Sequence, residues 1–200
     1  MPEKGNNDNN KTVYVALAKP SAKFFDPILE WAESFLFAIF VVLLIFIFVF
    51  RQVVVDGDSM NDTLADGQRL IITHAFYTPA HGDIIVFNSE GLNKTLIKRV
   101  IATGGETLVI NYKAHTVTVD GTVLSEPYIH SMMADESYFN KQYYNAETGD
   151  YTYHVPDGMV FAMGDNRNNS KDSRVDVVGF VPVDDILGKV ILRIKPFGKV

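Results

Sequence analysis

The sequence predicts a mainly β protein, in which one N-terminal transmembrane helix is followed by an antiparallel β domain. Three observations predict this fold class. Every residue from Phe35 to Phe50 is apolar, and with its flanks this run reaches the roughly 20 residues that span a bilayer as a helix. After Arg51 the chain changes to short β-branched runs separated by Gly, Pro and Asp, which is typical of antiparallel strands and turns. No second domain of different composition appears, so we expect a single domain over residues 52–200.

The chain before this domain divides into a tail and an anchor. Residues 1–26 are predicted to form a flexible tail, because the polar stretch Glu3–Asn10 cannot bury enough apolar surface to offset chain entropy. Residues 27–51 are predicted to form the anchor helix. A buried core helix or strand is one alternative, but the apolar run is long for a strand and lacks a polar stripe. A cleaved signal peptide is another, but no small-residue cleavage pattern follows, and Glu30 and Glu33 precede the run.

The expected strands are rich in β-branched residues and end near Gly, Pro or Asp. They are Gln52–Val55, Arg69–Thr73, Asp83–Phe87, Thr95–Ala102, Thr107–Ile110, Thr116–Val119, Thr122–Leu124, Met159–Met163, Val175–Val181 and Lys189–Ile194. The clearest hairpin turn is Asp120-Gly121, because this pair suits a turn with positive φ.

A tyrosine-rich segment around residues 125–158 departs from this strand pattern. Its six tyrosines are Tyr128, Tyr138, Tyr143, Tyr144, Tyr151 and Tyr153. We expect an insertion, either an elaborated loop or a small subdomain whose rings cap the sheet, rather than an aromatic binding platform.

The composition excludes several classes of function. A net charge of -6 and the absence of a basic cluster argue against a nucleic-acid partner. The chain has no cysteine, which excludes disulfides, a thiol nucleophile and a cysteine-ligated metal. None of the five histidines lies in a recognised metal-binding spacing, and we expect neither a metal nor another cofactor.

Three segments place polar and charged residues within this apolar pattern. Gly57–Leu64 follows the predicted anchor and contains Ser59, although most serines in a Gly-Asp-Ser sequence form turns. Lys98 interrupts the apolar strand Thr95–Ile101, where it would ordinarily extend its amine to solvent. Gly164–Arg174 is a polar loop that could be a surface turn, or could hold another loop through charge-assisted hydrogen bonds.

In this order, the segments resemble the conserved boxes of bacterial type I signal peptidases. The matching residues are Ser59-Met60 with Thr63-Leu64, Gly82–Phe87, Lys98–Ile101 with Gly105-Glu106, and Gly164–Arg174. Each box alone is a weak or moderate signal, whereas the ordered set is specific. The resemblance covers roughly Phe35 to Val190 and implies an antiparallel β catalytic domain of the signal peptidase type.

The resemblance also implies the roles of the site residues. Ser59 would attack the peptide carbonyl and Lys98 would accept its proton, in a Ser/Lys dyad without a catalytic histidine. Ser170 would hydrogen-bond the lysine amine, and Asp172 and Arg174 would brace the site. A lysine at its usual pKa of about 10.4 is neutral at pH 7 only about four times in ten thousand, so the pKa of Lys98 must be lowered. Burial among apolar neighbours is the expected cause.

Three sites depart from the family pattern. Asp62 stands where proline is usual, and Gly104-Gly105-Glu106 replaces proline-glycine-aspartate. Members with two membrane helices place a serine hydroxyl two residues before the nucleophile as an oxyanion donor, and here that residue is Gly57. We therefore expect the Ser59 backbone N–H to be one oxyanion donor and assign no second donor. The Gly-Asp-Ser-Met sequence is similar to the single-anchor members of Gram-positive bacteria.

The family's substrates are preproteins that carry signal peptides, cleaved after small residues in an Ala-X-Ala pattern. An extended substrate is expected to add a strand to a free sheet edge. The predicted pocket walls are Val55, Met60, Leu64, Leu96 and Ile97. The resemblance further implies a single-pass cell-membrane protein with a cytoplasmic N-terminus and an extracytoplasmic catalytic domain, in contact with the lipid bilayer and near the protein export machinery.

Two other functions compete with this interpretation. Another Ser/Lys peptidase, such as a self-cleaving repressor or a plasmid-transfer maturation enzyme, is disfavoured by the anchor and by the lack of a DNA-binding helix pair before Ser59. An inactive membrane-tethered β domain that binds extended peptides could lose Ser59 or Lys98, and this sequence keeps both.

Overall fold

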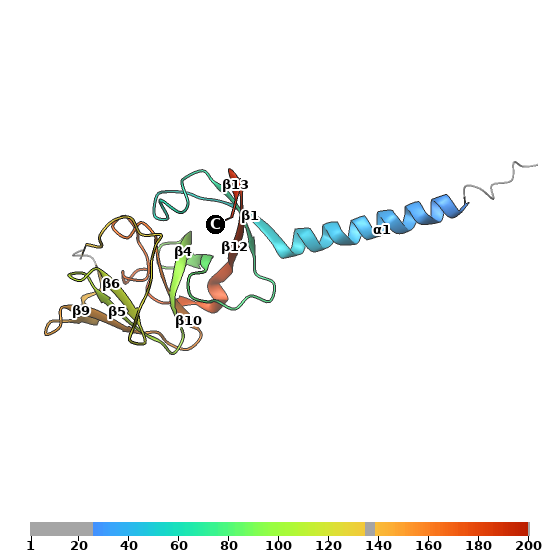
Figure 1. Cartoon of the computed structure of the whole chain (residues 1–200). Helices are drawn as coiled ribbons and strands as arrows, with labels where there is room; N and C mark the ends of the chain where they lie inside the picture. The colour runs from blue at the N-terminus through green and yellow to red at the C-terminus, as the bar shows by residue number, and fades with distance from the viewer. Residues whose placement is uncertain (1–25, 135–138, 200) are drawn as a thin grey trace, which may run out of the picture. The chain divides into compact units, whose positions relative to one another are not determined.

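The computed structural model describes residues 26–134 and 139–199, so the predicted tail lies almost entirely outside the described residues. The chain divides into two compact units, one ending at Leu44 and the other beginning at Ile45. Helix α1 (Asp26–Val49) is the long helix in Figure 1. Within it, Leu29–Val49 is 21 residues long with a mean hydropathy of 2.8, and its side chains are not buried. This helix fits a single-pass membrane anchor.

The helix ends two residues earlier than predicted, because strand pairing begins at once. Strand β1 (Phe50–Val54) pairs antiparallel with β2 (Arg69–Thr73), and the first pair is Phe50 with Thr73. Backbone N–H and C=O groups from Phe50 onward therefore bond to β2 rather than continue the helix.

All strands in the structure pair in antiparallel fashion, which confirms the predicted mainly β fold class. The larger sheet has the order β1-β2-β12-β3-β4-β10-β11, and β13 pairs with β12. Its remaining strands are β3 (Ile84–Ser89), β4 (Lys94–Thr103), β10 (Met159–Met163), β11 (Val181–Pro182), β12 (Ile186–Lys195) and β13 (Phe197–Gly198).

A smaller five-stranded sheet has the order β7-β6-β5-β9-β8. Its strands are β5 (Thr107–Asn111), β6 (Thr116–Val119), β7 (Thr122–Val123), β8 (Tyr144–Asn145) and β9 (Asp150–His154). Strands β5, β6 and β9 lie together in Figure 1, apart from β12 and β1. Two short 3-10 helices, η2 (Lys141–Tyr143) and η3 (Val183–Asp185), complete the described elements.

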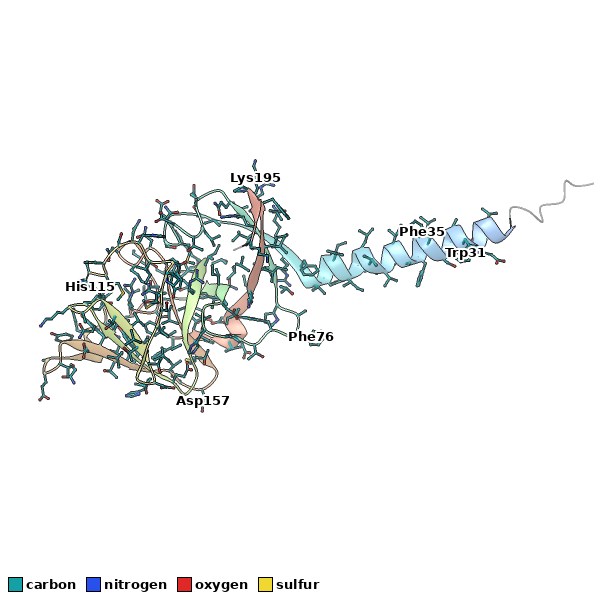
Figure 2. The ribbon with its side chains drawn as sticks, viewed as in Figure 1. Trp31, Phe35, Phe76, His115, Asp157 and Lys195 are labelled. Carbon is teal, nitrogen blue, oxygen red and sulfur yellow. The ribbon has the colours of Figure 1, made fainter. Side chains whose placement is uncertain are left out.

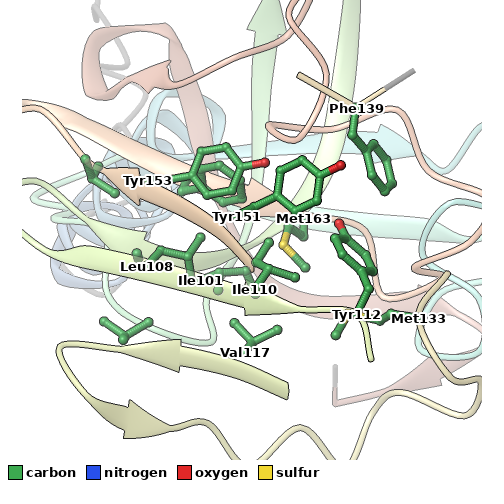
Figure 3. Close-up of a cluster of buried hydrophobic side chains, with 14 of the residues drawn as sticks. Ile101, Leu108, Ile110, Tyr112, Val117, Met133, Phe139, Tyr151, Tyr153 and Met163 are labelled. Carbon is green, nitrogen blue, oxygen red and sulfur yellow. The ribbon is translucent and has the colours of Figure 1, made fainter. Parts of the chain in front are cut away.

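The tyrosine-rich segment contributes to the core of the smaller sheet. Tyr151 and Tyr153 alternate with exposed or half-buried residues on β9 and are fully buried. Their rings lie 6.5 Å apart and nearly parallel, next to Leu108 and Ile110 of β5 (Figure 3). Part of the predicted insertion is therefore an integral strand, because a tyrosine ring on the inner face of a sheet packs like any large apolar side chain.

The prediction of a strand at Val175–Val181 is wrong. Only Val181 lies in a strand, and residues 175–179 form a turn in which Val178 N–H and Gly179 N–H both bond to the Val175 carbonyl. Val175 is buried in the core that includes Tyr151 and Tyr153. Its apolar character therefore reflects packing beneath a turn and not strand pairing.

Candidate active site

Ser59 lies in a compact turn that follows β1. The turn is closed by hydrogen bonds from Asn61 N–H to the Asp58 carbonyl and from Leu64 N–H to the Met60 carbonyl. Gly57 enters it with φ of +94° and donates its N–H to the Asp66 carboxylate at 2.8 Å. A side chain is rarely tolerated at this φ, so Gly57 permits the bend that brings Ser59 out of the strand.

Lys98 is brought to Ser59 by the middle of β4. Its side chain is 2% exposed, and its amine donates to Ser59 Oγ at 2.7 Å and to the Ile97 carbonyl at 2.9 Å. Lys98 pairs with Ile85 of β3, which is fully buried. The strand therefore holds the amine at the nucleophile in an apolar setting, and the two residues predicted as a dyad are in contact.

Burial lowers the pKa of Lys98 to about 8, because the charged amine loses its hydration. The carboxylates of Asp172 and Asp165 oppose this shift, whereas the guanidinium of Arg174 adds to it. A pKa of about 8 leaves about a tenth of the amines neutral at pH 7, some hundreds of times more than at the usual value. The predicted desolvation of Lys98 is therefore confirmed in its direction and cause.

Asp172 and Arg174 form a fully buried ion pair in the polar loop. Two guanidinium nitrogens of Arg174 donate to the two oxygens of Asp172, each at 2.8 Å, and Gly164 N–H donates to Asp172 at 3.0 Å. Arg174 also donates to the Arg167 carbonyl at 2.7 Å. Burial alone would raise the pKa of Asp172, but Arg174 outweighs it and keeps that pKa below its usual value. These bonds join the two ends of the loop, and the bracing role of the pair stays a prediction.

Ser170 does not make the hydrogen bond that the resemblance implied. Lys98 donates to Ser59 and Ile97, not to Ser170, and the Ser170 side chain instead contributes a hydrogen bond that helps lower the pKa of Asp172. Ser170 also packs against Gly164, where a Cβ would stand only 2.3 Å from its Oγ. Its observed contacts are therefore with Asp172 and with the glycine at the start of the loop.

Polar contacts tie the Gly164–Arg174 loop to β4 and to the nucleophile turn, through residues to which the sequence analysis assigned no role. Arg99 donates twice to Asp165, at 2.8 and 2.7 Å, and the Thr63 hydroxyl donates to Asp165 at 2.5 Å. Asn166 donates its N–H to the Ser59 carbonyl and its side-chain amide to the Asp58 carbonyl, both at 3.1 Å. For Asp165 and Asn166 the sequence did give a signal, which was the density of polar side chains in Gly164–Arg174. That density predicted that the segment could hold another loop, but it did not identify the residues that the segment contacts.

The departures from the family pattern are accommodated locally. Glu106 accepts hydrogen bonds from Thr103 N–H at 2.6 Å and from His81 at 2.7 Å. Burial opposes the ionised form, but these hydrogen bonds and the His81 charge lower the pKa of Glu106. Gly105 N–H bonds to the Val155 carbonyl, so this turn is held without a proline. Asp62 is exposed and lies 3.9 Å from His130.

A cavity of about 500 Å³ contains both Ser59 and Lys98. Four of the five predicted wall residues line it, namely Val55, Met60, Leu96 and Ile97. Leu64 does not line it. This residue is fully buried in the core, because the turn from Met60 directs its side chain inward. Asp56, Lys94 and Lys171 also line the cavity and were not predicted.

Two strand edges border this cavity. Residues 94–98 of β4 pair with β3 on one side, whereas β10 pairs only with Arg99–Thr103 on the other. β1 stands at the end of the larger sheet's strand order and supplies Val53 and Val54 to the cavity. Unpaired backbone N–H and C=O groups at such edges can accept an added strand. Over the described ranges, no cluster of three or more metal-ligating side chains occurs.

Comparison with known proteins identifies the family of the chain. The sequence model described as "Signal peptidase, peptidase S26" matches residues 28–195. The chain belongs to the signal peptidase family. Signal peptidase I T of Bacillus subtilis is 32% identical over all of this chain and 97% of its own length. A probable signal peptidase I-1 of Synechocystis is 38% identical over 80% of this chain and 78% of its own length.

A solved signal peptidase I from Enterococcus faecalis is 31% identical and covers 56% of this chain and 97% of its own length, with a TM-score of 0.44. The region matched by the signal peptidase model includes α1 from residue 28 onward and nearly all of the β domain. Ser59, Lys98 and the Gly164–Arg174 loop all lie within it.

Proposed function

We propose that this protein is a membrane-anchored serine endopeptidase that removes signal peptides from exported preproteins, with Ser59 as nucleophile and Lys98 as general base. The observation that supports this proposal is the 2.7 Å contact between the Lys98 amine and Ser59 Oγ, in a cavity with apolar walls at Val55, Met60, Leu96 and Ile97. The relatives named signal peptidase I supply the substrate class.

The proton transfers follow from the contacts of Lys98. In the structure the amine donates to Ser59 Oγ. Once the amine is neutral, it can keep its N–H bond to the Ile97 carbonyl and direct its lone pair toward Ser59 Oγ, so that the serine hydroxyl becomes the donor. As Ser59 Oγ bonds to the substrate carbonyl carbon, its proton passes to Lys98. The resulting ammonium then protonates the departing amine of the mature protein, and the peptide C–N bond breaks. In the second half of the reaction, water attacks the acyl-enzyme ester and gives its proton to Lys98. Lys98 then returns a proton to Ser59 Oγ as the ester bond breaks, which releases the signal peptide and restores both residues.

The developing oxyanion is proposed to bind the Ser59 N–H. In the described part of the chain, this group takes no part in the hydrogen bonds that hold the turn. Asn166 binds the Asp58 carbonyl, which belongs to the same peptide unit. A trans peptide directs its N–H opposite to its C=O, so Asn166 orients the Ser59 N–H as well. Preorganised donors of this kind stabilise the transition state.

The substrate is proposed to lie extended between β1 and the free edge of β4. Main-chain hydrogen bonds would bind it, and alternate side chains would enter the cavity. Val55, Met60, Leu96 and Ile97 give that cavity apolar walls, which suit the small residues of an Ala-X-Ala sequence. We place the N-terminus in the cytoplasm and the β domain outside the cell membrane, because exported preproteins are cleaved there, near the export machinery.

Cleavage of a purified preprotein in detergent by the full chain tests the proposal. Ser59→Ala and Lys98→Ala should each abolish cleavage while far-UV circular dichroism remains unchanged. Ser131→Ala and Lys113→Ala change exposed residues of the same types and should retain full activity. Substantial activity in either dyad variant would overturn the dyad. A wild-type chain that binds the peptide without cleaving it would instead show a peptide-binding domain.

A further inference from the structure

A second cavity lies at one end of the β1–β2 ladder, away from Ser59 and Lys98. Its volume is about 360 Å³, and its lining includes Phe48, Val49 and Ile72 as apolar walls. Its ionisable groups are Arg51 and His74. The pairing of Phe50 with Thr73 explains this grouping, because Arg51 and His74 each follow one member of that pair along the chain.

The Arg51 guanidinium in this cavity has no acidic partner among the described residues. Neither Arg51 nor His74 forms an ion pair with any described residue. Asp83, in the segment that follows His74, is already bound by Lys189 at 2.5 Å and by the Tyr77 hydroxyl at 2.9 Å. The Arg51 guanidinium is therefore available to an external anion.

The position of Arg51 in the chain indicates which anion it meets. The apolar span Leu29–Val49 is 21 residues long, which as a helix is about 32 Å and matches a hydrocarbon core of about 30 Å. Arg51 is the second residue after this span, at the depth of lipid phosphates. The chain's net charge of -6 disfavours contact with an anionic membrane, so a local cation is needed there.

Phe76 lies in the loop that follows His74 and is fully exposed. Its relative exposure is 106% and its φ is +54°, and Figure 2 shows its ring projecting away from the β domain. A bulky residue with positive φ is uncommon, and burying a phenylalanine side chain is favourable by about 2 kcal/mol. An exposed phenylalanine that adjoins a membrane anchor can insert at the boundary between headgroups and acyl chains. Phe197 is also exposed, but it follows Lys195, which pairs with Arg69 at the opposite end of the ladder.

We infer that the cavity at Arg51 and His74 binds the phosphate group of an anionic membrane lipid, with Phe76 inserted beside it among the acyl chains. A guanidinium binds phosphate through two parallel hydrogen bonds, and the apolar walls accommodate the glycerol end of the lipid. This inference rests on the proposed membrane anchoring, but not on the proposed peptidase chemistry.

Lipid binding can be measured separately from cleavage in the full chain carrying Ser59→Ala. Native mass spectrometry from detergent containing phosphatidylglycerol or phosphatidylcholine counts the lipids retained. We expect preferential retention of one phosphatidylglycerol, weakened about fivefold by Arg51→Gln. Arg69→Gln removes an exposed arginine at the other end of the same ladder and should change nothing. Equal losses in both variants, or none with Arg51→Gln, would overturn the site.

A second measurement leaves Arg51 intact, so it tests the inference even if Arg51→Gln does not fold. In a Trp31→Phe background, Phe76→Trp in vesicles should be quenched by lipids brominated on the acyl chain, whereas Phe197→Trp should not. An unquenched Phe76→Trp refutes insertion. Displacement of phosphatidylglycerol by inorganic phosphate would show a site for free anions and would refute the lipid assignment.

Discussion

Replacing Lys98 with methionine should stabilise the β domain by about 3 kcal/mol at pH 7 while abolishing cleavage. Burial lowers the pKa of Lys98 from 10.5 to about 8, and each pH unit of this difference corresponds to about 1.4 kcal/mol. Below pH 8 the folded domain holds a buried charge and bears this cost in full. Between pH 8 and 10.5 the folded protein releases the proton before the unfolded chain does, so the cost disappears.

The assay is thermal unfolding of the full chain in detergent, followed by circular dichroism of the β domain. At pH 7 the methionine variant should unfold about 6 to 12 °C higher than wild type. At pH 9.5 the free-energy difference should fall to about 1.4 kcal/mol. Lys113→Met changes an exposed lysine and should leave the midpoint nearly unchanged. A lower midpoint for Lys98→Met, or a difference independent of pH, would refute the argument from burial.

Three further predictions concern catalysis. The kcat/KM for a preprotein should rise about tenfold per pH unit up to about pH 8 and then level off, because only the neutral Lys98 amine accepts a proton; a decrease over this range would exclude the base role. Gly164→Ala should lower kcat about hundredfold, since its Cβ would stand 2.5 Å from the Ser59 carbonyl oxygen. Gly198→Ala, whose Cβ meets only a movable guanidinium at 3.2 Å, should retain kcat. Asn166→Ala should lower kcat at least tenfold with little change in KM, and steady-state kinetics showing a change in KM alone would contradict its positioning role.

The strand pattern was predictable where side-chain alternation matched strand pairing. Thr116–Val119 and Met159–Met163 have the predicted bounds, because β-branched or apolar residues there end at turn-forming neighbours. β9 was missed because its buried residues, Tyr151 and Tyr153, carry hydroxyls and resemble polar positions in a sequence. Val175–Val181 failed for the opposite reason, since apolar residues can pack beneath a turn.

The candidate site was predictable in its chemical groups but not in its contacts. A lysine inside an apolar strand indicated that Lys98 is desolvated, and the structure agrees. The pairing of Arg99 with Asp165 could not be deduced, because 66 residues separate them and only the fold brings them together. Ser170 shows the limit of resemblance, since its hydroxyl packs against Gly164 and the Lys98 amine donates to Ser59 and Ile97 instead.

The short connection between α1 and the nucleophile turn acts as a tether of fixed length. Ser59 is ten residues beyond Val49, the last residue of the helix, and ten extended residues reach at most about 34 Å. In the proposed reaction, a peptide bond farther than this from the membrane surface is beyond reach, whatever its sequence. Small-residue sequences are common in mature proteins, and this tether protects those that have moved away from the membrane. The distance of a peptide bond from the membrane would therefore limit cleavage in addition to the side chains that precede the bond.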